Sequence, residues 1–66
     1  MIPQHDHPLT LAYIASVRAK NHDQMREASR LIAALEQLCS DTVRAQCKLA
    51  AEVLLERTNP FLHSHP

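Results

Sequence analysis

Apolar side chains recur at steps of three and four residues through the first half of the chain. From Leu11, these steps fall on Ile14, Arg18, Asn21, Met25, Ala28, Ile32, Leu35 and Cys39. Only Arg18 and Asn21 interrupt the apolar face, and its phase is the same on both sides of them. Since this spacing is that of one face of an α-helix, the pattern predicts one long helix over about residues 8–38.

The interruption also allows a second interpretation, in which the chain breaks near residues 21–23. Asn21 or Asp23 could cap a new helix there, because a short polar side chain can accept a hydrogen bond from the exposed backbone N–H groups of a first turn. The fold would then be a bundle of three helices. The preserved phase favours the continuous helix.

A second stop follows at the residues CSDT, where Ser40 or Asp41 can cap another helix. That helix is predicted over about residues 41–57, and the proline of the sequence TNP ends it. A connection of two or three residues favours an antiparallel hairpin. The fold class is therefore all-α, a single domain over residues 1–66 with loose tails at 1–7 and 59–66. The absence of glycine and the placement of all four prolines near the ends agree with this class.

The charges of the second helix predict how the hairpin is paired. Its cations, Arg44 and Lys48, precede its anions, Glu52 and Glu56, an order that opposes the helix dipole. Folded back against the first helix, Arg44 would approach Glu36, and the two glutamates would approach arginines there.

This pairing leaves the beginning of the first helix uncovered, which predicts a homodimer. A chain of 66 residues buries a small core, and its net charge of zero gives no repulsion between copies. A bend at Asn21 that folds the helix back on its own hairpin is the alternative. The predicted dimer interface consists of Leu11, Ile14, Val17, Asn21 and Met25.

Two histidine pairs are the main candidates for chemistry, in the sequences HDH (residues 5–7) and HSH (residues 63–65). Such pairs can bind zinc, but structural zinc sites hold their ligands on ordered elements, so we expect solvated histidines and no metal or cofactor. Cys39 and Cys47 are expected to be small buried residues. No catalytic motif occurs, and the chain is not expected to be an enzyme.

The remaining features favour a protein partner. No signal peptide or membrane-spanning run is present, so a cytoplasmic protein without a membrane partner is expected. Zero net charge makes nucleic acid a weaker candidate than protein. The expected contacts are Tyr13, Arg18, Arg26 and Phe61, because tyrosine and arginine often dominate interfaces and aromatic residues are otherwise missing.

Together these features predict a small regulatory protein that docks on a larger protein and blocks it sterically. Bacterial or phage inhibitors and anti-activators of a transcription regulator or a motor enzyme are examples of this class, by analogy of size and architecture. The alternative is a dimeric helical hairpin that binds RNA or DNA.

Overall fold

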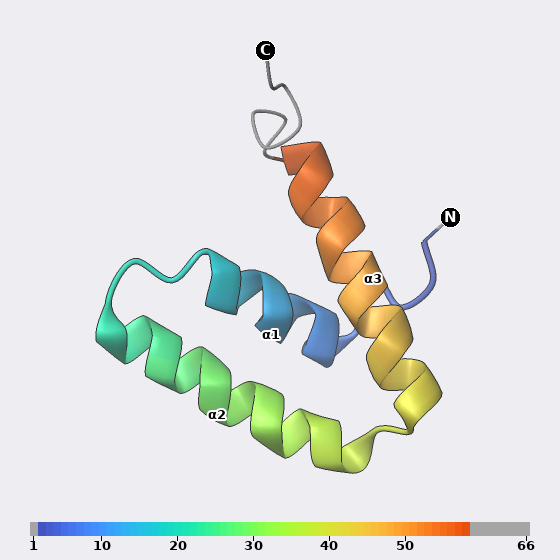
Figure 1. Cartoon of the computed structure of the whole chain (residues 1–66), viewed down its shortest axis with the longest axis horizontal. Coiled ribbons are helices and arrows are strands. Elements are labelled where there is room, and N and C mark those ends of the chain that lie inside the picture. The colour runs from blue at the N-terminus through green and yellow to red at the C-terminus, as the bar shows by residue number, and fades with distance from the viewer. Residues whose placement is uncertain (1, 59–66) are drawn as a thin grey trace.

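The computed structural model describes residues 2–58, which form three helices (Figure 1). They are α1 (Pro8–Val17), α2 (His22–Leu38) and α3 (Asp41–Thr58), and no strand occurs within the described range. The all-α class is confirmed, and the last helix has the predicted bounds to within one residue. Phe61 and the other residues after 58 lie outside the description.

The prediction of one continuous helix over residues 8–38 is wrong, because the backbone leaves the helix between Val17 and His22. Asn21 is extended, and its side-chain oxygen accepts a hydrogen bond from the backbone N–H of Gln24 at 2.9 Å. The Gln24 side chain in turn accepts from the backbone N–H of Lys20 at 2.8 Å. The first bond satisfies a donor that the start of α2 leaves unpaired, and the second ties the connecting segment to the first turn, so both stabilise the break. The three-helix alternative therefore has the right number of helices.

The break changes how the helices pack. α1 turns back along α2 and also contacts α3, so it is the central helix of the three. Within residues 2–58, α2 and α3 touch little and diverge from their connection at Cys39–Ser40 (Figure 1). The predicted pairing of α3 along the preceding helix is thus not seen. Arg44 instead forms an ion pair with Asp41, one turn earlier on its own helix.

The segment before α1, expected to be loose because it is polar, is hydrogen-bonded to α1 and α3. Gln4 donates from its side-chain amide to Gln46 on α3 at 3.3 Å, and its carbonyl accepts from the buried Thr10 hydroxyl at 2.6 Å. His7 caps α1, since its Nδ1 accepts from the backbone N–H of Leu9 at 3.0 Å. Pro8 occupies the first turn of α1, where its missing N–H costs nothing.

Small side chains fill most of the interior. The buried apolar residues are Leu9, Ala12, Ala28, Cys47, Ala50 and Ala51. Leu9 is the only large one among them, and it lies on the central helix. The fold extends only 16 Å along its shortest axis, against 40 Å and 32 Å along the other two, so the helices lie in a thin layer. A layer this thin leaves each helix with an exposed face.

Candidate functional site

Large apolar side chains lie on the outside of the layer. Six of those in residues 2–58 are exposed, to between 45% for Met25 and 82% for Leu38; the others are Leu11, Val17, Leu31 and Leu49. An isolated exposed leucine is common in proteins, but an exposed apolar side chain that lines a groove marks a candidate interaction surface, and Leu31 and Val17 each line a groove beside α1. The candidate site is therefore an interface, and two grooves beside α1 define it.

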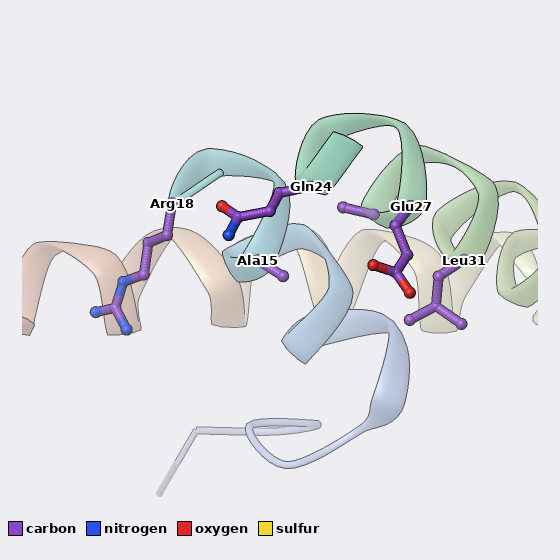
Figure 2. A pocket seen from close by; sticks show the side chains of 6 residues that line it. Ala15, Arg18, Gln24, Glu27 and Leu31 are labelled. Carbon is purple, nitrogen blue, oxygen red and sulfur yellow. The ribbon is translucent and has the colours of Figure 1, made fainter. Parts of the chain in front are cut away.

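The first groove, called the α1–α2 groove, has a volume of about 430 Å³. It is lined by Ala15 and Arg18 of α1 and by Gln24, Glu27, Ala28 and Leu31 of α2. Figure 2 shows Arg18 at one end of this row, Glu27 and Leu31 at the other, and Ala15 between them. Small Ala15 and polar Gln24 thus lie at the centre of the groove, with opposite charges at its ends.

Helical spacing extends this surface. Leu11 lies four residues before Ala15, so the two share one face of α1. Leu38 lies seven residues after Leu31, so these two share one face of α2. Leu11 and Leu38 are both strongly exposed. An apolar face therefore continues from the α1–α2 groove along both helices.

The second groove, called the α1–α3 groove, lies between the central helix and α3 and has a volume of about 250 Å³. Its lining residues are Tyr13, Ser16, Val17, Lys48, Ala51, Glu52 and Leu55. Val17 is 63% exposed here, so a large apolar side chain projects at the edge of a mostly apolar depression. Lys48 and Glu52 supply one charge of each sign.

Tyr13 also links the central helix to α2. Its hydroxyl donates a hydrogen bond of 2.6 Å to a carboxylate oxygen of Glu36, and both side chains are half-buried. Burial raises the pKa of Tyr13 to about 12, and the hydrogen bond and negative charge of Glu36 add to this rise. The tyrosine therefore holds one wall of the α1–α3 groove in place.

The predicted partner contacts do not form one surface. Tyr13 lines the α1–α3 groove, whereas Arg18 lines the α1–α2 groove. Arg26 is exposed on α2, two residues from the buried Ala28, and Phe61 lies outside the described residues. The sequence pattern thus selected residues on different sides of α1.

The predicted dimer residues are also divided. Leu11 is on the stripe of Ala15, Val17 lines the α1–α3 groove, and Ile14 is half-buried. Asn21 caps α2, and together with Met25 it lines a shallow depression at the connection of α1 and α2.

Sequence reasoning missed Leu31, Leu38, Ala15 and Glu27, which define the α1–α2 groove and its extension. A signal was available for the two leucines, because they are seven residues apart and fall beside the seam of Ala28 and Leu35. A second apolar stripe next to the inward face gives α2 more apolar surface with which to contact another molecule.

The chemistry of the described residues is limited. Residues 2–58 bring together no group of three or more histidine, cysteine or acidic side chains that could hold a metal ion, and His63 and His65 fall after this range. Both cysteines are free thiols, with Cys47 buried as predicted and Cys39 half-buried. Among the helices of this part of the chain, none has the length and apolar character needed to span a membrane.

No model of a protein family, no curated protein and no solved structure matches the chain.

Proposed function

We propose that this chain is a small helical regulatory protein that docks on a larger protein and blocks it sterically. The α1–α3 groove is the proposed docking site, and an amphipathic helix of the partner is its occupant. Recognition of this kind seats apolar residues spaced along one face of a helix in a groove between two others. The mechanism needs no bond to be made or broken.

The exposure of Val17 is the observation that carries this proposal. An apolar side chain that is 63% exposed beside Tyr13 and Leu55 offers contact area that the other described residues do not cover. Burying a comparable side chain of the partner there contributes about 1.5–3 kcal/mol. Lys48 and Glu52 line the same groove and would orient the incoming helix through its own charges.

A binding experiment with a matched pair of variants tests the proposal. Proteins that the chain captures from a cell lysate are identified, purified and titrated by calorimetry against wild type, Val17→Glu and Leu49→Glu. Val17 and Leu49 are almost equally exposed, at 63% and 62%, but only Val17 lines the α1–α3 groove. Val17→Glu is expected to weaken binding about tenfold or more, while Leu49→Glu leaves it unchanged.

Salt separates this function from binding of nucleic acid. A docked apolar helix keeps most of its affinity as salt rises, whereas a nucleic acid loses affinity steeply because counterions are released on binding. Equal affinity of wild type and Val17→Glu would contradict the proposed groove, and a steep loss with salt would contradict a protein partner.

A further inference from the structure

The α1–α2 groove has features that fit a copy of itself. Its two charged lining residues have opposite signs, with Arg18 at one end and Glu27 at the other (Figure 2). Between them lie the exposed side chains of Ala15 and Gln24, and the buried Ala28 also lines the groove. A surface that carries a cation and an anion at opposite ends of a centre of small and polar side chains is complementary to itself after rotation by half a turn.

We infer that a second copy of the chain covers the α1–α2 groove, related by a two-fold axis that passes near Ala15. Arg18 of each copy then meets Glu27 of the other, so the contact forms twice. The alanine side chains at the axis allow the helices to approach closely. Leu31, next to Glu27, packs against the methylene stem of Arg18 from the other copy.

The small hydrophobic core is the reason for inferring that a second copy, and not a transient partner, covers the α1–α2 groove. Within residues 2–58, only one large side chain, Leu9, lies among the buried apolar residues, whereas Leu31 and Leu38 remain outside. A fold of 66 residues with so small a core needs a cover that is always present, and another copy is present whenever the protein is made. The net charge of zero adds no repulsion to the association.

This inference does not rest on the proposed partner groove, which lies on the other side of α1, between α1 and α3. The two can fail separately, since Val17 lines only the α1–α3 groove and Leu31 only the α1–α2 groove. Loss of partner binding with the dimer intact would count against the proposed function alone.

Sedimentation equilibrium of the full chain tests the inferred dimer. The wild type is expected to approach twice the mass of one chain, which is 7.5 kDa, at about 100 μM. Leu31→Asp places two buried charges in each dimer, so it should raise the dimer dissociation constant about 100-fold. Leu49→Asp is the matched control, because Leu49 is more exposed than Leu31 but lies on α3, and it should leave the constant unchanged.

Charge exchange tests the pairing itself. Arg18→Glu alone and Glu27→Arg alone each create two like-charge contacts across the axis, and each should weaken the dimer about tenfold. The double variant restores opposite charges and should return the constant to within about threefold of wild type. Circular dichroism at the same concentrations verifies that each variant keeps its helices.

A wild type that stays at the mass of one chain overturns the inference. So does a dimer that Leu49→Asp disrupts and Leu31→Asp does not. A double variant as weak as the two single variants contradicts the pairing of Arg18 with Glu27 and therefore the position of the axis.

Discussion

Replacing Tyr13 by phenylalanine removes the one hydroxyl that ties α1 to Glu36 on α2. A hydrogen bond to a charged group contributes about 1.5–3 kcal/mol, and partial exposure of this pair to water reduces that value. Tyr13→Phe should therefore lower the free energy of unfolding by about 1–2 kcal/mol. For a domain of this size the melting temperature should fall by about 5–15 °C.

The same bond predicts how stability depends on pH. The pKa of Tyr13 is about 12 in the folded chain, against 10.0 ordinarily, so the fold favours the neutral hydroxyl. The stability that comes from burial of the neutral hydroxyl and from its bond to Glu36 is fully present below about pH 10 and is lost as pH rises from 10 to 12. Above that range the tyrosinate and the Glu36 carboxylate repel each other.

Absorbance of tyrosinate measures this shift without ambiguity, because the chain has one tyrosine and no tryptophan. The titration midpoint should lie near pH 12 in the folded protein and near pH 10 in urea. Glu36→Gln keeps an acceptor but removes the charge, so its midpoint should fall between these values. Helicity is recorded in parallel, at one protein concentration throughout.

A midpoint near pH 10 while the helices remain intact would refute the contact between Tyr13 and Glu36. A Tyr13→Phe variant that unfolds at the same urea concentration as wild type would refute the value of about 1–2 kcal/mol assigned to this hydrogen bond.

Three further predictions concern the ends of the helices and the interior. His7→Ala should cost about 1 kcal/mol in urea unfolding, because the backbone N–H of Leu9 loses its acceptor, and His7→Asp should restore the loss. Asn21→Ala should cost a similar amount and speed hydrogen exchange at the Gln24 amide, since the cap holds that amide; unchanged exchange would contradict the cap. Cys39 should react with a thiol reagent at least tenfold faster than the buried Cys47, whereas equal rates would mean that Cys47 is not enclosed.

The sequence predicted the helices better than their connection. The apolar spacing keeps the same phase on both sides of residues 18–21 although the backbone leaves the helix there, so periodicity did not reveal the break. The break was marked by Asn21 with Gln24 three residues later, a spacing typical of a helix start. Apolar periodicity alone could not show that this capping pattern outweighs the signal for one continuous helix.

The packing of α3 was not predictable from its charges. The order of Arg44 and Lys48 before the glutamates suggested pairing with the preceding helix, yet Arg44 pairs with Asp41 on its own helix. Exposed ion pairs are worth a few tenths of a kcal/mol, so burial of Cys47, Ala50 and other small residues against α1 decides the arrangement instead.

The candidate surfaces were only partly predictable for a related reason. The predicted interface followed one apolar seam, of which Ala28 is buried while Leu11 and Met25 stay exposed. Leu31 and Leu38 lie beside it and are exposed by 50% and 82%. Which neighbouring stripe stays outside depends on the angle at which α1 crosses α2, and this angle follows from the break at residues 18–21.

Isotope-filtered NMR on a mixture of labelled and unlabelled chains tests most directly whether a second copy completes this fold. A two-fold dimer predicts contacts between the Ala15 methyl groups of the two copies. It also predicts contacts from the Leu31 methyl groups of one copy to the side-chain methylenes of Arg18 in the other. A spectrum without contacts between copies, or with contacts only from Leu49 and Val17, would contradict it.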